Sequence, residues 1–278
     1  MDTRARLTQL AALLLVAVVG GALPTTPKSA RFKLVIGNKA YSSWSLRAWL
    51  ALHHAVGVKG FKECCVELAG AGSDANKLAL MEHSPTGKVP ALDDFLLDVT
   101  VWDSLAIAEH IAECYPAAEL WPSDPRARAM ARSVVAEMHS GFAALRSAMP
   151  MNVRRLQETR SSEGSTGSSS SFDSSSFDSS SFDSSSFEPA VLSDMARIMQ
   201  IWERCRKEHG RGGPFLFGKF SIADCMYAPV VMRFRRFAPP LSPIASAYCD
   251  AIEAWPAMAE WVAAAKEESA RIEQYEAS

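Results

Sequence analysis

Three short polar segments, each placed where a helix or strand is expected to begin, constrain the fold of this chain most strongly. The first, 41–47, reads Tyr-Ser-Ser-Trp-Ser-Leu-Arg and follows the apolar run 33–36. The second, 84–90, ends in a Val-Pro step, and the third is the acid–serine pair Asp103-Ser104. A hydroxyl cluster after a strand, a Val-Pro step before a strand and an acid–serine pair opening a helix together form the layout of a ligand-binding site.

The spacing of apolar residues predicts a small α/β half followed by an all-helical half. We expect strands at 32–36, 61–68, 89–92 and 96–101, the last two as a hairpin turning at Asp93-Asp94. Helices are expected at 46–56, with Ser45 as its cap, at 74–81 and at 104–114. Further helices are expected at 125–149, 189–209, 221–234, 245–254 and 256–270. The chain therefore divides into a leader at 1–30, an α/β domain at 31–122 and a helical domain at 123–278.

The leader is predicted from its charge and hydropathy. Arg4 and Arg6 precede an apolar stretch, 10–19, which is followed by small residues. This stretch is shorter than the roughly 20 residues that a membrane span needs, so we expect no stable span. The pattern favours a secretory signal or an organelle-targeting leader, a plastid being one destination if the leader is bipartite. The alternatives are a short membrane anchor or a wrongly assigned start.

Cysteine spacing and net charge exclude some classes of protein. The six cysteines are scattered and show neither CxxC nor zinc-ligand spacing, so we expect free thiols and no metal site. Free thiols favour a reducing compartment, such as an organelle interior. A net charge of −2 argues against a nucleic-acid-binding surface.

A serine-rich insert is expected at about 157–188. It contains repeats of Ser-Ser-Ser-Phe-Asp/Glu that place a phenylalanine at every fifth position, a period that fits neither a helix nor a strand. Such a composition buries too little apolar surface to offset the entropy of ordering. We therefore expect a disordered loop between two helices, the alternative being a phosphorylated or binding segment.

Ser42 and Ser43 are the candidate catalytic residues. A hydroxyl at a helix N-terminus can donate to an anion, and the helix dipole adds positive potential there. A thiolate bound at this point would be stabilised, which would lower its pKa below the usual value of about 8.5. The alternative is that these serines only form a turn and cap the helix.

The other two segments offer peptide-binding groups. The Val89-Pro90 step is a place for a cis proline, next to which the backbone of Val89 can pair with an extended peptide. Ser104 and the backbone at a helix start can hold a ligand carboxylate, while Asp103 meets an ammonium group. The alternative is that Asp103 and Ser104 only cap the helix.

Together these segments resemble the glutathione S-transferase superfamily, in particular its serine-type, zeta-like classes. Segment 42–47 is similar to the serine motif of those classes, Ser-Ser-Cys, with Trp44 in place of the cysteine. Segment 84–90 is similar to the family's Asn-Pro-x-x-x-Val-Pro turn, with Ser84 in place of Asn, and 102–107 to its Glu/Gln-Ser-x-Ala-Ile helix start. Residues 220–224 are similar to its Ser/Thr-x-x-Asp capping box. The resemblance covers about 32–150 and 189–268.

This resemblance implies a thioredoxin-like α/β domain followed by an all-α helical domain, with glutathione as co-substrate. It implies that Ser42 stabilises the thiolate, with Ser43 as the alternative, and that the chain is a homodimer with Asp103 near the dimer seam. The glutathione-binding residues that it implies are Lys88, Val89, Pro90, Asp103 and Ser104.

An electrophile pocket is expected beside the serines. Its predicted residues are Trp44, Met138, His139 and Phe142, with Met149 and Met151 as further candidates. The alternatives are that the methionines and Phe142 are core residues and that His139 is a core histidine rather than a general acid.

Three functions remain open from the sequence. The first is a transferase that conjugates glutathione to a small hydrophobic electrophile, as in detoxification. The second is a glutathione-dependent isomerase of the maleylacetoacetate type, which Ser42-Ser43 favours and Trp44 disfavours. The third is a non-catalytic protein that binds glutathione.

Overall fold

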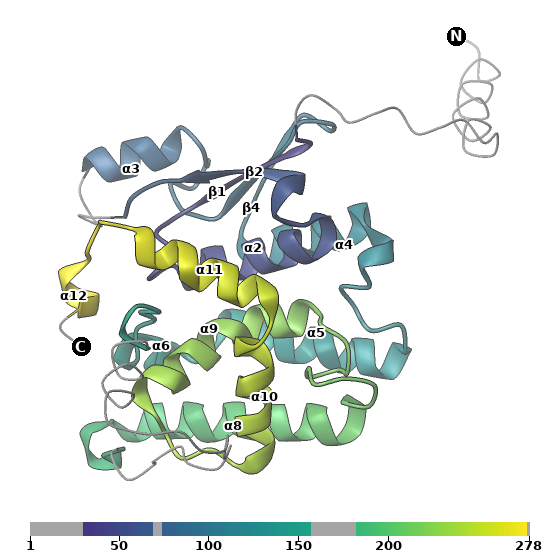
Figure 1. Cartoon of the computed structure of the whole chain (residues 1–278), viewed down its shortest axis with the longest axis vertical. Helices are drawn as coiled ribbons and strands as arrows, with labels where there is room; N and C mark the ends of the chain where they lie inside the picture. The colour runs from purple at the N-terminus through teal and green to yellow at the C-terminus, as the bar shows by residue number, and fades with distance from the viewer. Residues whose placement is uncertain (1–29, 69–73, 157–181, 277–278) are drawn as a thin grey trace, which may run out of the picture. The chain divides into compact units, whose positions relative to one another are not determined.

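A computed structural model describes residues 30–68, 74–156 and 182–276 (Figure 1). The predicted leader, apart from its last residue, and residues 157–181 of the serine-rich insert lie outside the described residues. The compact unit Arg31–Ser278 contains all the elements described below.

A four-stranded mixed sheet forms the first half, in the order β2-β1-β3-β4. β1 (Phe32–Ile36) pairs in parallel with β2 (Phe61–Cys65) and antiparallel with β3 (Ala91–Asp94), which pairs antiparallel with β4 (Val99–Trp102). α2 (Ser43–Val56) and α4 (Ser104–Cys114) pack together between the sheet and the helical half, and α3 (Asp74–Met81) lies beyond the opposite face (Figure 1). This is the predicted thioredoxin-like arrangement.

The second half is helical, as predicted. Its elements are α5 (Pro125–Ser140), α6 (Ala143–Ala148), α8 (Pro189–His209), α9 (Ile222–Phe237), α10 (Pro243–Glu253), α11 (Pro256–Glu267) and α12 (Glu273–Glu276). Short 3-10 turns occur at Val58–Gly60, Pro116–Ala118 and Ser184–Ser186.

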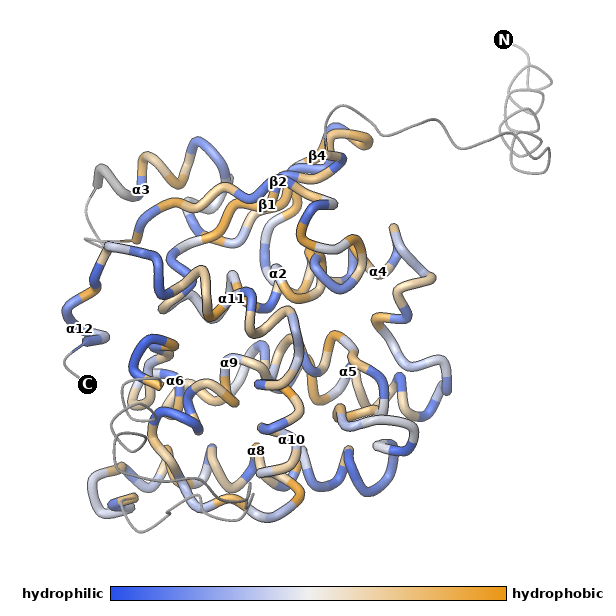
Figure 2. Tube along the Cα trace, in the orientation of Figure 1, coloured by the Kyte–Doolittle hydropathy of each residue, from blue (hydrophilic) through white to orange (hydrophobic). Residues whose placement is uncertain are grey.

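α9 and α11 join the helical half to the sheet domain. α9 packs against both α2 and α5, and each of its residues from Ile222 to Arg235 is buried. α11 returns along α2 (Figure 1), where the indole of Trp261 donates to the backbone carbonyl of Lys39 at 2.9 Å. Figure 2 shows apolar residues in β1 and hydrophilic ones at the C-terminal end of α8. One hydrophobic core therefore runs through both halves and fixes the start of α2.

Among the predicted boundaries that differ from the structure, three do so for identifiable local reasons. α2 begins at Ser43 because the Ser42 hydroxyl, not that of Ser45, caps it by accepting from the Ser45 amide. The hairpin turns at 95–98 because Asp94 still pairs with Phe32 in the ladder. The predicted helix 125–149 is divided between α5 and α6 at Gly141-Phe142, where Phe142 is left-handed with φ 59°.

The end of the serine-rich insert lies within the described residues. Phe182 and Phe187 stack with ring centroids 5.4 Å apart, and Phe187 meets Phe237 of α9 edge-on. The last two phenylalanines of the repeats, one from each of the last two repeats, therefore pack against the helical half.

All six cysteines are free, as predicted. Within the described parts of the chain, no helix combines the length and apolar character that crossing a membrane requires.

Candidate functional site

The two candidate serines lie at the N-terminus of α2 and are nearly buried. Ser42 donates its hydroxyl hydrogen to the Ser45 hydroxyl at 2.7 Å, and the Ser45 oxygen also accepts from the amide of Gly37 at 3.0 Å. The hydroxyl of Ser42 is therefore held by its own helix cap.

Ser43 has a different partner. Its oxygen accepts a hydrogen bond of 2.8 Å from the Arg233 guanidinium, which reaches it from α9. Its hydrogen points toward the sulfur of Met151 at 3.8 Å, a weak acceptor. A cation therefore sits beside a hydroxyl whose hydrogen is free to turn to a stronger acceptor.

The Val-Pro segment packs against residues 37–43, which connect β1 to α2 and which we call the serine loop. The Val89–Pro90 peptide bond is cis, which confirms the prediction. A methyl group on Gly37, directly after β1, would lie 3.2 Å from the Val89 side chain and 2.5 Å from that of Leu68, so any larger residue there would force the Leu68 side chain to shift. Val89 is half-buried, Pro90 is buried and Lys88 is exposed beside them.

Asp103 and Ser104 lie at the start of α4, as predicted. Asp103 has φ 73° and ψ 132°, a conformation that non-glycine residues rarely adopt outside functional sites. One of its carboxylate oxygens accepts from the amides of Leu105 and Ala106. The hydroxyl of Ser104 is buried, and within the described part of the chain it has no hydrogen-bond partner.

Trp44 and His139 connect the serine loop to Asp103. The two rings meet edge-on with centroids 5.3 Å apart, and His139 Nε2 lies 3.2 Å from the other Asp103 oxygen. Met138 and Phe142, in contrast, are buried in the core. The structure thus brings Trp44 and His139 together beside Asp103, while Met138, Phe142, Met149 and Met151 are buried within the hydrophobic core, where Met151 also contacts Ser43.

Three arginines that the sequence reasoning did not assign surround Trp44 and Ser43. Arg47 lies over the Trp44 ring at 4.4 Å from its centroid, and Arg146 at 5.4 Å. Arg47 and Arg233 are buried, which lowers the pKa of Arg47 to about 9 and that of Arg233 to about 10, with neighbouring arginines adding to both shifts. We call Arg47, Arg146 and Arg233 the arginine cluster.

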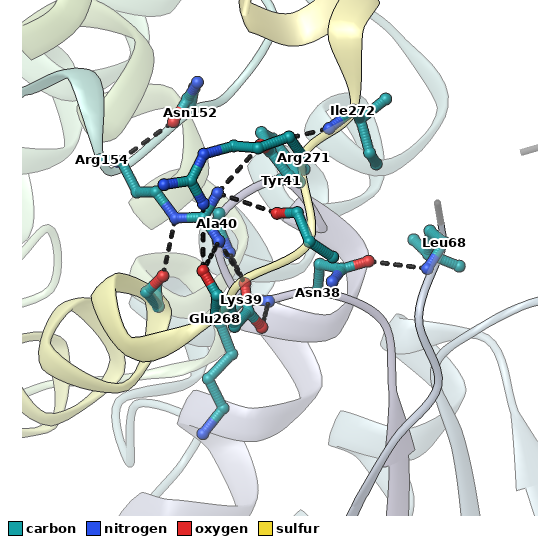
Figure 3. Close-up of polar contacts among 12 residues, drawn as sticks. Asn38, Lys39, Ala40, Tyr41, Leu68, Asn152, Arg154, Glu268, Arg271 and Ile272 are labelled. Carbon is teal, nitrogen blue, oxygen red and sulfur yellow. Dashed lines mark hydrogen bonds and ion pairs between the residues drawn. The ribbon is translucent and has the colours of Figure 1, made fainter. Parts of the chain in front are cut away.

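Glu268, near the C-terminus, and Arg154 hold the backbone of residues 39–41, which precede Ser42 in the sequence (Figure 3). We call these two side chains the clamp. Glu268 accepts from the amides of Lys39 at 2.6 Å and Ala40 at 3.1 Å. Arg154 donates to the Tyr41 hydroxyl and to the backbone carbonyl of Glu268. The start of the serine loop is thereby tied to residues more than two hundred positions away along the chain.

A second cluster lies away from this site, between β3 and α4. Ligand atoms of Asp94, His110 and Cys114 lie within 4.8 Å of one another. However, Arg31 donates two hydrogen bonds to Asp94 and one to Cys114. This guanidinium already supplies the positive charge that a metal ion would bring, so the group is an ion-pair network.

Comparison with known proteins identifies the family. Residues 41–114 match the model of the glutathione S-transferase N-terminal domain, and 127–264 that of the C-terminal domain. A probable maleylacetoacetate isomerase of Caenorhabditis elegans is 32% identical over 126 residues, which are 45% of this chain and 52% of that protein. The chain thus spans about half the length of this curated relative.

Solved structures show the same fold. The holo structure of maleyl pyruvate isomerase, a bacterial zeta-class protein, superposes with a TM-score of 0.57 at 24% identity, covering 86% of this chain and all of that one. A glutathione transferase homolog from Burkholderia BGR1 with bound glutathione gives 0.55 at 21% identity, covering 86% and 99%. Because the two domain models together match well over half of its length, the chain belongs to the glutathione S-transferase family.

Proposed function

We propose that the protein is a glutathione transferase that joins the thiolate of glutathione to a small electrophile. The observation that carries this proposal is the hydrogen bond from the buried Arg233 guanidinium to Ser43, at the N-terminus of α2. An anion bound beside Ser43 would be stabilised by the dipole of α2, by the serine hydroxyl and by the guanidinium of Arg233. A thiol bound at this point would ionise more readily than in water.

Ser43 is the better donor to the sulfur of the two candidate serines. The hydrogen of Ser42 is already used in its bond to Ser45. The oxygen of Ser43 accepts from Arg233, which polarises the hydroxyl and leaves its hydrogen to turn from Met151 to a thiolate. We therefore assign the contact with the glutathione sulfur to Ser43. The sequence favours Ser42 for this role, but in the structure Ser42 caps α2.

The rest of the site fits a glutathione molecule. The buried hydroxyl of Ser104, which has no hydrogen-bond partner among the described residues, suits the carboxylate of the γ-glutamyl end, and Asp103 suits its ammonium group. Val89 offers its backbone to the cysteinyl part next to the cis bond. The exposed Lys88 is free to reach the glycine carboxylate. We also propose a homodimer, in which Asp103 lies near the seam.

In the proposed reaction, the thiolate sulfur attacks an electrophilic carbon and a carbon–sulfur bond forms. The electron pair displaced from carbon leaves with a departing anion, such as chloride from an aryl chloride. Binding both reactants side by side, and holding the thiol as its anion, are the two contributions of the protein.

A second candidate is a glutathione-dependent cis–trans isomerase, which the similarity to the probable maleylacetoacetate isomerase favours. The thiolate would add to a double bond and leave again after rotation, so the same serine and arginine would serve. Trp44, in the place where the resemblance has cysteine, weighs against it. Direct assay of both reactions separates the two candidates.

The test compares Ser43→Ala with Ser42→Ala. We expect Ser43→Ala to raise the pKa of bound glutathione, read from thiolate ultraviolet absorbance, by about one unit or more, and to lower kcat/KM for an aryl chloride roughly 10²-fold. Ser42→Ala should act mainly through the lost cap, at about 1 kcal/mol of stability. An unchanged pKa and rate in Ser43→Ala would refute the assignment, and glutathione binding without turnover of either reaction type would favour a non-catalytic role.

A further inference from the structure

The turn that joins β3 to β4 carries three consecutive large apolar side chains on the surface of the protein. Phe95, Leu96 and Leu97 are 55%, 70% and 57% exposed. Val99, the first residue of β4, is also exposed. Turns are normally built from Gly, Pro, Asn, Asp or Ser, and a run of exposed apolar residues marks a contact surface. We call residues 95–97 and Val99 the hairpin tip.

The hairpin tip is held in a fixed conformation. The Asp94 carboxylate accepts from the amide of Leu96 at 3.0 Å and from Nε of Arg31 at 2.9 Å. The amide of Phe95 donates to the backbone carbonyl of Arg31 at 3.0 Å. Asp98 closes the turn in a left-handed conformation, with φ 53°. The turn therefore presents its apolar side chains already ordered, so burying them against a partner costs little further backbone entropy.

The proposed dimer does not account for the hairpin tip. Its seam is proposed near Asp103, which follows the C-terminal end of β4, whereas the tip lies at the N-terminal end of that strand. The four steps from Val99 to Asp103 correspond to about 13 Å of extended chain. A stable contact between two proteins also takes roughly 20–30 residues on each side, and the four residues of the tip are too few to form one.

A lipid bilayer fits such a surface better than a protein does. Lipid surrounds a small apolar projection without needing a complementary shape, and each side chain that enters it gains by leaving water. The amides of Phe95 and Leu96 are already bonded to Arg31 and Asp94. Fewer backbone groups therefore lose a water partner when the tip enters the lipid.

The charges around the hairpin tip favour neutral lipid. Lys33 pairs with Asp93 at 2.8 Å, and Arg31 pairs with Asp94. These two basic residues are therefore already matched by acidic ones, and Asp98 adds a negative charge within the turn. Anionic headgroups, which attract uncompensated Lys and Arg, gain nothing from this surface.

The chain leads from the hairpin tip to a second apolar segment. Arg31, whose carbonyl is bonded to the tip, directly follows the predicted leader. Residues 10–19 of that leader are all apolar, and only the eleven residues 20–30 separate them from Arg31. One weak membrane contact becomes stable when a second contact on the same molecule acts with it. The tip thus adds to the alternative that the leader is a short membrane anchor.

We propose that the hairpin tip inserts into the surface of a neutral lipid bilayer and holds the folded unit against it. This inference goes beyond the transferase function and does not depend on it. It agrees with the expectation that the chain has no stable membrane span, because the side chains of one turn enter only the outer layer of the bilayer.

The test measures how the full-length chain partitions onto phosphatidylcholine vesicles, by co-flotation in about 0.5 M salt, which screens the basic residues of the leader. The double variant Leu96→Asn/Leu97→Asn is expected to lower the partition coefficient about tenfold or more. Leu78→Asn/Met81→Asn is the matched control, since Leu78 and Met81 are comparably exposed apolar residues but lie on α3. The control should bind as the wild type does, and thermal unfolding checks that both variants are folded.

A tryptophan reporter shows which surface meets the lipid, even if the asparagine variant does not fold. The fluorescence that Leu96→Trp adds to the wild-type signal should be quenched by vesicles of brominated phosphatidylcholine, whereas that of Leu78→Trp should not. The proposal is overturned if the wild type does not bind vesicles, if the Leu96→Trp signal is not quenched, or if the tip and control variants bind alike, as they would if the leader alone held the chain. It is also overturned if the tip variant loses self-association in light scattering while its partition is unchanged, because the tip would then contact a second copy.

Discussion

Removing the Glu268 carboxylate should destabilise the loop that leads to Ser42 and Ser43, although Glu268 contacts neither serine. Its oxygens accept from the amides of Lys39 and Ala40, and the next residues along the chain are Tyr41 and Ser42. In Glu268→Ala both amides lose their acceptor. Arg154 keeps its bonds to backbone carbonyls and to the Tyr41 hydroxyl, so it should remain in place (Figure 3).

The size of the effect follows from the burial of the two amides. Lys39 is 8% exposed and Ala40 is fully buried, and a buried donor left without a partner costs about 1–3 kcal/mol. The Glu268 side chain itself is 16% exposed, so water can replace part of the loss. We therefore expect the free energy of unfolding to fall by about 2–3 kcal/mol, which for a domain of this size lowers Tm by roughly 5–10 °C.

The assay combines thermal unfolding with glutathione kinetics. Because the loop in front of Ser42 loses its anchor, kcat/KM should fall about tenfold even at temperatures where the variant is fully folded. Glu267→Ala is the matched control, since Glu267 is the preceding, exposed residue of α11. If Glu268→Ala and Glu267→Ala show the same Tm and the same kcat/KM, the reasoning about the clamp is wrong.

Two further predictions concern buried carboxylates. Asp224→Ala should lower the free energy of unfolding by about 3–5 kcal/mol in denaturant titrations, because the carboxylate accepts from the Ser221 amide and hydroxyl and from the Leu216 amide. Burial raises the pKa of Asp224 to about 6. The difference in free energy of unfolding between the wild type and Asp224→Asn should therefore shrink as pH rises through that value. Arg31→Met should cost about 3 kcal/mol at neutral pH because it leaves the Asp94 carboxylate buried without its guanidinium. Since Arg31 holds the pKa of Asp94 below its usual range, this cost should diminish below about pH 4, and a constant difference between wild type and variant across the acid range would contradict it.

The parts of the fold that the sequence predicts well are those set by local signals. α8 has the predicted bounds because Pro189 favours its start and Gly210 its end. The capping box of α9 is present as predicted, with Ser221 and Asp224 bonded to each other. In contrast, the break at Gly141-Phe142 lies within a continuous helical pattern and depends on how α6 packs against α8.

The same distinction applies to the site. The three motif segments predict which residues gather, because each begins an element at one end of the sheet. Arg233 and Glu268 contact the serine loop across about two hundred residues of chain, and no periodicity encodes such pairs. One local signal for Arg233 did exist. It is a charged residue that directly follows the largely apolar run 225–232 of α9, and such a residue is expected to be buried and in need of a partner.

Trp44, which stands where the serine motif of the zeta-like classes has a cysteine, also stabilises the buried arginine cluster. The Trp44 ring faces Arg47 and Arg146, and each such contact is worth about 0.5–2 kcal/mol when partly desolvated. A cysteine at position 44 would offer no aromatic face, so Arg47 would remain buried with neither a ring nor an anion. Trp44 and the arginine cluster therefore form one unit, in which the ring holds the guanidinium groups in place. A Trp44→Cys change should accordingly destabilise the protein, and a thermal unfolding midpoint equal to that of the wild type would refute this role of the ring.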